Sequence, residues 1–392
     1  MPELDMVRGI AILMVVLFHG FEDFAPTGPS APGWERLFLS TVGLGWAGVN
    51  VFFVLSGFLI TGILLDSVDN PRYYSRFYSR RALRILPAYY LLIAVILMVG
   101  RISFVTRRTS WAFAGLSFVY LSNITPLLGV SRDYAPLWSL AVEEHFYLLW
   151  PAAVRRLRSG VATLAALVCL CEPFLRAICA ARGGLWWGPY TWLSADGLAL
   201  GALLAVFARS GWSSRRNLLW LAVWAGLFAI VMLAASVRIP RFMSISLRAT
   251  CVSYGSFSLV AAVLWLGTGE YRRFVNVPIL SFYGFISYGL YLIHALLFSL
   301  YNDVAAAFVP SFRVEQSFVK CLVRLVVVLA IATGTAYLSR TTYEEYFLRM
   351  KDKLGGKRER AQPAQPVAPV LSSQDVRDNL VPTSRGEIAR SE

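Results

Sequence analysis

Charged residues are scarce in this chain, and their scarcity argues against an ordinary soluble domain. Only 15% of the 392 residues are Asp, Glu, Lys or Arg, whereas 57% are hydrophobic and the mean hydropathy is +0.58. A soluble domain typically carries about 25% charged residues. Apolar runs of about 20 residues recur almost to the end, and each is long enough to cross a bilayer. The composition therefore predicts an all-α polytopic membrane helix bundle embedded in a lipid bilayer.

The five cysteines lack the spacing of a metal site. Cys169, Cys171 and Cys179 fall within one apolar segment, and Cys251 and Cys321 lie in two others. Zinc ligands form Cys and His clusters at short spacings, and the sequence contains no such cluster. We interpret the cysteines as buried thiols and expect no metal.

Three further features of the sequence narrow the class of protein. The first apolar segment has no small-residue cleavage site, so we do not expect a cleaved signal peptide. The net charge of +14 does not indicate a nucleic-acid partner, because the Arg residues lie between apolar segments, where the positive-inside rule explains them. We also see no internal repeat of the kind that marks many transporters.

About ten segments are predicted to cross the membrane, near residues 9–26, 40–65, 85–100, 137–154, 161–181, 190–208, 218–236, 247–267, 278–301 and 319–338. The apolar stretch 111–128 is broken by Asn123, Pro126 and Gly129, so we expect it to re-enter the membrane or lie on its surface. With that choice most Arg-rich loops and both termini fall on the cytoplasmic side.

The end of the chain has a different composition. Residues after about 355 are rich in Pro, Ala, Gln and charge, which predicts a disordered cytoplasmic tail. We assign residues 1–345 to a transmembrane domain and residues 346–392 to this basic tail.

His19 is the residue that suggests catalysis. The expected span 9–26 places it about midway across the bilayer, where an ionisable side chain is a functional candidate by default. A neutral imidazole can accept a proton from a hydroxyl near pH 7. A His that only hydrogen-bonds a neighbouring helix is an equally good interpretation. Arg8, with Glu3 and Asp5, lies near the inner interface, where a structural ion pair is slightly favoured.

Arg80, Arg81 and Arg84 come just before the predicted span 85–100. On a helix they share one face, and guanidinium groups bind phosphates in a bidentate manner. Arg clusters at inner loop ends also arise from topology alone, and this alternative is the commoner one.

A further polar cluster opens the span after residue 137. It comprises Trp138, Glu143, Glu144 and His145. Acidic groups at a helix start can be simple caps. Two carboxylates and a His exceed what capping requires, so one of them could contact a sugar hydroxyl or orient another His.

Other polar groups are compatible with substrate binding or with helix packing. Tyr288 and His294 can line one side of a helix, although interhelical hydrogen bonding is the commoner use of such residues. Asp196 lies near the start of a span, and Glu172 and Arg176, spaced i, i+4, are interpreted as a structural pair. Ser56 and Gly57 permit close helix approach, but a continuous helix does not offer a nucleophilic turn.

Six ordered motifs carry a resemblance to a known family. They are LDMVRGIAILMVVLFH, FFVLSGFLIT, RRALRILPAYY, WSLAVEEHFYLLWP, ADGLALGALLA and ISYGLYLIH. In this order, over residues 3 to about 345, the chain resembles the acyltransferase 3 family of integral-membrane O-acyltransferases.

The resemblance implies about ten spanning helices and transfer of acyl groups, often acetyl, from cytoplasmic acyl-CoA. It implies that His19 and Arg8 are catalytic, that Arg80, Arg81 and Arg84 bind the coenzyme, and that Glu143 is the acidic residue of the WSLxxE motif. Many members have Arg where this chain has Ser194, and the Pro of the closing pattern is missing around Tyr343–Tyr346.

These observations give one hypothesis. The chain is expected to be an enzyme of the bacterial inner membrane that moves an acyl group, with acetyl the expected one, from acyl-CoA to a carbohydrate or glycolipid hydroxyl. His19, Arg8 and Glu143 are the candidate catalytic residues. The candidate substrate-binding residues are Trp138, Glu144, Asp196, Tyr288 and His294. The alternatives are a transporter or flippase of a lipid-linked sugar, a structural bundle, and acylation of a small molecule such as a macrolide.

Overall fold

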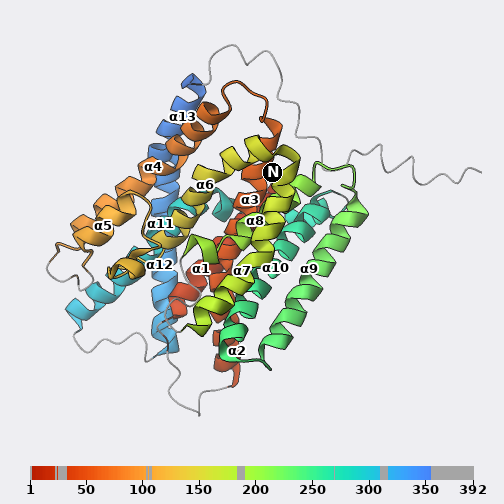
Figure 1. Ribbon diagram of the computed structural model, residues 1–392. Coiled ribbons are helices and arrows are strands. Elements are labelled where there is room, and N and C mark those ends of the chain that lie inside the picture. The colour runs from red at the N-terminus through yellow and green to blue at the C-terminus, as the bar shows by residue number, and fades with distance from the viewer. Residues whose placement is uncertain are drawn as a thin grey trace, which may run out of the picture.

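The computed structural model describes residues 2–22, 24, 33–102, 105, 108–182, 190–268, 270–309 and 317–354. Within these ranges the chain is a helical bundle without strands, as predicted (Figure 1). The predicted tail after residue 355 lies outside the described residues. The last described helix, α13, covers Glu345–Leu354, so the chain is still helical where the tail was expected to begin.

The described α-helices occur along the chain in the following order. They are α1 (Pro2–Phe21), α2 (Gly33–Val42), α3 (Gly48–Asp66), α4 (Tyr73–Val99), α5 (Trp111–Phe118), α6 (Leu137–Leu157), α7 (Val161–Ala181), α8 (Asp196–Phe207), α9 (Arg215–Ser236), α10 (Arg241–Gly267), α11 (Pro278–Phe308), α12 (Phe318–Leu338) and α13. A π-helical turn, Ser339–Glu344, joins α12 to α13.

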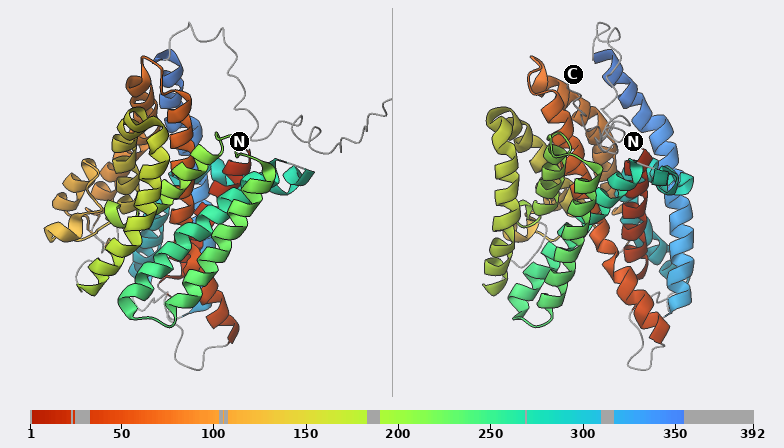
Figure 2. Two further views of the ribbon diagram at one scale, coloured as in Figure 1. Left: turned by 45° about the vertical axis from the view of Figure 1, so that its right-hand side comes forward. Right: turned by 90° about the vertical axis from the view of Figure 1, so that its right-hand side faces the viewer.

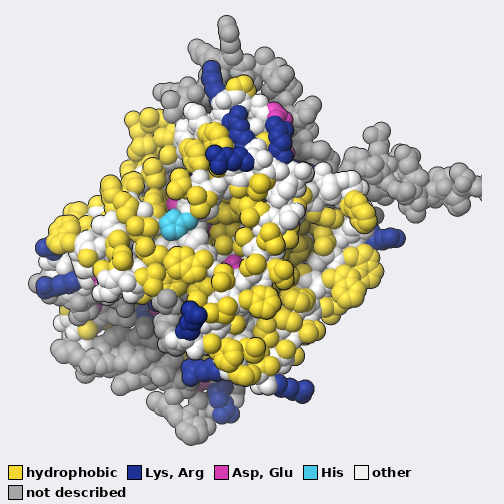
Figure 3. All heavy atoms as spheres, viewed as in Figure 1, with side chains coloured by type: hydrophobic (Ala, Val, Ile, Leu, Met, Phe, Trp, Pro, Cys, Tyr) yellow, Lys and Arg dark blue, Asp and Glu magenta, His cyan; other side chains and the backbone are white. Residues whose placement is uncertain are grey.

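Eight helical stretches of the described chain are long and apolar enough to cross a membrane. Three of them contain two α-helices: Gly33–Asp66 contains α2 and α3, Leu137–Ala181 contains α6 and α7, and Phe318–Met350 contains α12 and part of α13. Helix α8 is an apolar helix of 12 residues. The ten predicted spans correspond to α1, α3, α4 and α6 to α12, and the span 40–65 also includes the end of α2. Apolar side chains cover most of the face in Figure 3, and most Lys and Arg side chains in view lie near its edges, as a bilayer requires.

The first span is shifted relative to the prediction of 9–26. Helix α1 begins at Pro2 and ends at Phe21. Proline is favoured at the first position of a helix, and Glu3 and Asp5 in the first turn interact favourably with the helix dipole. His19 is consequently in the last turn of α1, about 25 Å along the axis from Pro2.

The segment 111–128 does not form a crossing helix. It contains the 8-residue helix α5 and a short 3-10 turn, Thr125–Leu128. The Ser110 hydroxyl caps α5 by accepting a hydrogen bond from the Phe113 backbone N–H at 3.2 Å. Helix α5 is too short to span a bilayer, which agrees with the expected re-entrant or surface segment.

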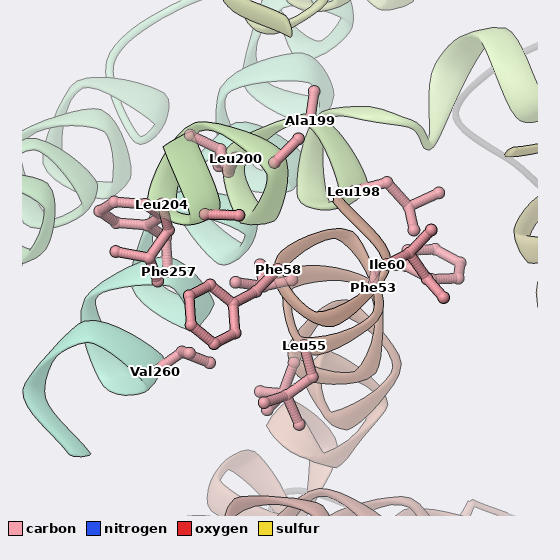
Figure 4. Close-up of a cluster of buried hydrophobic side chains, with 14 of the residues drawn as sticks. Phe53, Leu55, Phe58, Ile60, Leu198, Ala199, Leu200, Leu204, Phe257 and Val260 are labelled. Carbon is pink, nitrogen blue, oxygen red and sulfur yellow. The ribbon is translucent and has the colours of Figure 1, made fainter. Parts of the chain in front are cut away.

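Helices α3, α8 and α10 form much of the core. Large aliphatic and aromatic side chains interdigitate there, among them Phe53, Phe58, Leu204, Phe257 and Val260 (Figure 4). Helices α9 and α10 lie side by side in both views of Figure 2. Lipid tails are as apolar as these side chains, so close packing, rather than escape from water, holds the helices together.

Two glycines bring the α3 and α8 backbones into contact. A Cβ atom on Gly57 would lie 2.0 Å from the Leu198 carbonyl oxygen, and one on Gly201 would lie 2.1 Å from the Val54 carbonyl oxygen. No side chain fits in either place, because the neighbouring atoms belong to the backbone. The expectation that Gly57 permits close helix approach is confirmed.

We expect Gly57→Ala to lower the free energy of unfolding by about 1–3 kcal/mol, since the added methyl group must push α8 away. Gly334→Ala in α12 is the matched control, because a Cβ there has no atom within 4 Å. Thermal unfolding of purified protein in detergent measures both. Equal melting temperatures for the two variants would contradict the close α3–α8 contact.

Candidate active site

A cavity of 240 Å³ opens between α1, α3, α4, α6 and α11. It lies toward the end of the bundle where α1 begins. Its polar lining residues are Arg8, Ser56, Arg81, Arg84, Ser139, Glu143, Glu144, Tyr147, Ser287, Tyr288 and Tyr291. Six of the predicted site residues are therefore brought together here, although they come from four different helices.

One wall of the cavity is cationic. Arg81 and Arg84, spaced i, i+3 on α4, both line the cavity, whereas Arg80 does not. The Arg81 guanidinium lies 5.3 Å from the centre of the Tyr147 ring, which fixes its orientation. Arg8 is the third cation, and its Nη1 is 2.6 Å from Asp5 Oδ1. Arg8 from α1 is thus the third guanidinium that lines the cavity, whereas the binding role predicted for Arg80 stays a prediction.

The opposite wall is acidic. Glu143 and Glu144 lie almost two turns inside α6, which begins at Leu137, so neither caps that helix. Glu143 belongs to a hydrogen-bonded cluster with Ser56 and Tyr147. Helix α3 runs without interruption through Ser56, which agrees with the expectation that this serine has no nucleophilic turn. The cavity therefore brings guanidinium, carboxylate and hydroxyl groups together in one chamber.

His19 lies outside this cavity, at the far end of α1. Its Nδ1 is 2.7 Å from Glu22 Oε2, and the two side chains are 19% and 40% exposed. A carboxylate oxygen accepts hydrogen bonds, so the Nδ1–H group of His19 is the donor to Glu22 and the Nε2 atom points away from this contact. The carboxylate that orients His19 is therefore Glu22, which the sequence analysis missed, and not Glu143.

His294 forms a pair with His19. The two ring centres are 5.0 Å apart. His294 is completely buried, and its Nδ1 is 2.7 Å from the Tyr291 carbonyl oxygen, so Nδ1 is the protonated nitrogen. Its Nε2 has no hydrogen-bond partner among the described residues. Two imidazoles thus offer unprotonated nitrogens close together, an arrangement that suits a hydroxyl group as donor.

Tyr291 separates the cavity from the histidine pair. Its ring lines the cavity and lies 5.6 Å from the ring of His294. Its hydroxyl is 2.6 Å from the Ser139 hydroxyl oxygen and 3.3 Å from the Pro136 carbonyl oxygen. The start of α6 therefore holds Tyr291 in place between the two parts of the site.

His145, the remaining histidine, is hydrogen-bonded to a loop residue. Its Nδ1 is 2.6 Å from the Thr191 hydroxyl oxygen, which also accepts a hydrogen bond from Asn123 Nδ2 at 2.9 Å. These contacts join α6 to the loops before α6 and α8.

Three predicted substrate-binding residues do not line the cavity: His294, described above, Trp138 and Asp196. Trp138 packs edge-to-face against Phe53, with ring centres 6.0 Å apart. Asp196 is buried, and its Oδ2 is 2.8 Å from Arg176 Nη2. The same nitrogen is 3.0 Å from Glu172 Oε1, which confirms the predicted Glu172–Arg176 pair and extends it to a buried triad.

Arg324 on α12 is a buried cation that the sequence analysis missed. Its side chain is fully buried, and Nη2 donates a hydrogen bond to the Gly20 carbonyl oxygen at 2.8 Å. Nη1 donates to Asn302 Oδ1 at 3.2 Å. A cation at the carboxyl end of a helix satisfies its terminal carbonyl groups and its dipole. Arg324 thereby anchors the turn that carries His19.

We expect Arg324→Lys to lower the free energy of unfolding by about 1.5–3 kcal/mol, because a single ammonium group cannot make both charged hydrogen bonds. Thermal unfolding in detergent measures the change. The exposed Arg241→Lys provides the control, for which less than about 0.5 kcal/mol is expected. An Arg324→Lys protein as stable as the control would show that these bonds do not hold the α1 turn.

The comparisons with known proteins agree with this geometry. The sequence profile of the acyltransferase 3 family, described as an acyltransferase domain, matches residues 1–340. No solved structure is significantly similar to the chain.

Similar curated proteins come from bacteria. The peptidoglycan O-acetyltransferase OatA of Listeria monocytogenes is 32% identical over 165 residues, which are 38% of this chain and 24% of that protein. The O-acetyltransferase OatA of Staphylococcus aureus is 28% identical over 165 residues, 39% of this chain and 24% of that protein. The matched region therefore spans about a quarter of the length of these relatives. Because the family profile covers residues 1–340 of 392, the chain belongs to the acyltransferase 3 family.

Proposed function

We propose that this protein is an O-acyltransferase that moves an acetyl group from cytoplasmic acetyl-CoA to a hydroxyl of a carbohydrate or glycolipid. The observation that carries the proposal is the cavity in which Arg8, Arg81 and Arg84 face Glu143 and Glu144. Three guanidinium groups in one chamber suit the phosphates of coenzyme A. The names of the bacterial relatives, O-acetyltransferases that include one for peptidoglycan, support an acetyl donor and a cell-envelope carbohydrate.

The orientation in the proposal follows from charge. The cavity opens toward the end of the bundle where α1 begins, and Arg72, Arg76, Arg155 and Arg156 belong to loops or helix ends at that end. The positive-inside rule assigns such an end to the cytoplasm, where acetyl-CoA is made. The bacterial inner membrane with cytoplasmic termini is the corresponding localisation.

The histidine pair supplies the proton chemistry in this proposal. His19 Nε2 accepts the proton of the acceptor hydroxyl while the oxygen attacks the thioester carbonyl carbon. The carbon–sulfur bond then breaks, and the thiolate of coenzyme A leaves and takes up the proton from His19. Glu22 orients His19 and stabilises the imidazolium that forms in between, as a carboxylate does in other His-based catalysts.

In this proposal the acetyl donor must reach from the arginines of the cavity to the histidine pair. Arg8 and His19 are 11 residues apart on α1, about 16 Å along its axis. The extended arm of coenzyme A can run along the cavity with its phosphates at the arginines. Tyr291 and Ser139 close the end that faces His294, so the thioester reaches the histidines only when the Tyr291 side chain turns aside.

The decisive experiment measures coenzyme A binding. We expect Arg81→Ala combined with Arg84→Ala to weaken acetyl-CoA binding by about 10²-fold, because each lost charged hydrogen bond to phosphate removes about 1.5 kcal/mol or more. Isothermal titration with purified protein in detergent measures the affinity. Arg80→Ala is the matched control, since Arg80 does not line the cavity. Equal affinities for the double variant and the wild type would disprove the donor site.

A further inference from the structure

The arginine-lined cavity has a charged end and an end without charge. Arg81, beside the Tyr147 ring, marks the charged end. Ser139 lines the same cavity but precedes Tyr147 by eight residues on α6, which is about 12 Å along the helix axis. The lining near Ser139 includes its neighbour Leu140 and, from α3, Phe52. This uncharged end therefore suits the apolar part of a ligand whose anionic part lies at the arginines.

Tyr291 closes the uncharged end. Its hydroxyl is bonded to Ser139 and to the Pro136 carbonyl oxygen, as described above. Its ring packs between two other rings, with its centre 6.2 Å from that of Phe52 and 5.6 Å from that of His294. The residue is only 8% exposed. An aromatic ring that is held at its hydroxyl and by its neighbours thus forms the end wall of the cavity.

The backbone that carries Tyr291 is fixed as well. The Tyr134 hydroxyl, from the segment before α6, donates a hydrogen bond to the Leu292 carbonyl oxygen at 2.6 Å. The same oxygen accepts a hydrogen bond from the Leu296 backbone N–H at 3.2 Å. Closely packed interiors yield little, and extra methylene groups force neighbouring side chains out of their preferred rotamers. The end wall is therefore expected to stay in place when a ligand that fits the cavity binds.

We infer that Tyr291 is the specificity-determining residue for the acyl chain of the donor and restricts the protein to very short chains such as acetyl. This step rests on the proposed function, in which the coenzyme phosphates bind at the arginines. The arm between the phosphates and the sulfur has a fixed covalent length, so the arginines set how deep the thioester lies. The acyl group lies beyond the sulfur, and each added methylene group enters space that the Tyr291 ring occupies.

The selection acts when the donor binds, before the Tyr291 side chain turns aside. An acetyl group fits in front of the ring in its observed position. A longer chain binds only if the ring moves first, which breaks the hydrogen bonds to Ser139 and Pro136. Chain length should therefore change the affinity for the donor, and a binding measurement is sufficient to detect it.

Isothermal titration of the purified chain in detergent tests the inference without an activity assay. The probes are acetyl-CoA, butyryl-CoA and hexanoyl-CoA, which share the coenzyme and differ only in acyl length. We expect the wild type to bind acetyl-CoA about tenfold or more tightly than butyryl-CoA, a discrimination typical of a pocket that excludes added methylene groups. Free coenzyme A, which has no acyl group, should bind the wild type and the variants alike.

A series of side-chain sizes at position 291 provides the sharpest readout. Tyr291→Leu is expected to admit butyryl-CoA but not hexanoyl-CoA, and Tyr291→Ala to admit both. Each newly admitted donor should gain about tenfold in affinity, whereas the affinity for acetyl-CoA stays near that of the wild type. A limit that shifts stepwise with side-chain volume is not produced by general loosening of the fold.

Phe282→Ala is the matched control. It removes a ring from the same helix, but Phe282 is 38% exposed and does not line the cavity. It should keep the wild-type preference for acetyl-CoA. Thermal unfolding confirms that each variant is folded, and Tyr291→Leu, which retains a large apolar side chain, provides the test if Tyr291→Ala does not fold.

The outcomes distinguish this inference from the proposed function. An unchanged preference in the folded position-291 variants, or equal affinity of the wild type for all three donors, would overturn the role of Tyr291 and leave the donor site standing. A wild type that binds none of the three donors would overturn both.

Discussion

His19→Ala is expected to lower the rate of acetyl transfer by about 10²- to 10⁴-fold, because the reaction loses the general base that removes the hydroxyl proton. Binding of acetyl-CoA should not change, since His19 does not line the cavity with Arg81 and Arg84. The loss is therefore expected in kcat and not in the KM for the donor. Ester-linked acetate, released from envelope carbohydrate by mild base, measures transfer in cells.

His145→Gln is the matched control for this variant. It removes an imidazole whose Nδ1 contacts Thr191, away from the cavity lining, and Gln can preserve that hydrogen bond. We expect transfer close to that of the wild type. If His145→Gln and His19→Ala reduced transfer equally at equal protein levels, the effect would be structural and His19 would lose its proposed role.

Glu22 offers a finer test of the same mechanism. Gln in its place keeps the size of the side chain but presents a neutral amide to Nδ1 instead of a carboxylate. The amide cannot stabilise a positively charged imidazolium as the carboxylate does. The rate of transfer should fall, although less than in His19→Ala. The accompanying change is in the pH dependence of kcat, a readout that a purely structural role for Glu22 does not move.

Arg176→Met is expected to lower the free energy of unfolding by about 3–5 kcal/mol, because it leaves the Glu172 and Asp196 carboxylates buried without their counter-ion. Arg176 also donates to the Leu193 carbonyl at 2.8 Å and to the Thr250 hydroxyl at 3.3 Å. The variant therefore loses the link between α7, the loop before α8, and α10. Thermal or denaturant-induced unfolding of the purified protein measures the loss.

Removing the charges together provides the control. Arg176→Met combined with Glu172→Gln and Asp196→Asn should recover much of the lost stability, since no unpaired charge stays buried. Asp196→Asn alone discriminates between a structural and a substrate-binding role. A variant of normal stability with strongly reduced transfer would restore Asp196 as a substrate-binding residue.

Local patterns in the sequence predicted much of the fold. Ten apolar runs predicted ten helices, and the interruptions at Asn123, Pro126 and Gly129 correctly argued against an additional crossing. The start of α1 was also available, because Pro2 followed by Glu3 and Asp5 is a typical amino-terminal helix signal. Placing the span at 9–26 followed hydrophobicity alone, so the start of α1 at Pro2 was missed.

The composition of the site depended on contacts between distant segments. Spacing on one helix brought Arg81 and Arg84 together, but no periodicity could add Arg8, which lies on another helix. The pairing of His19 with His294 depends on how α1 packs along α11. The triad that takes Asp196 away from the cavity likewise joins separate helices.

The sequence by itself determined that the protein is a helical membrane bundle, which family it belongs to, and which residue types can perform chemistry. Only the tertiary structure decided that Tyr291 lies between the arginine-lined cavity and the histidine pair. The physical reason is that hydrophobicity and helical period act within one helix, whereas the meeting of side chains depends on packing between helices. In this protein that packing depends on backbone contacts at positions such as Gly57 and Gly201.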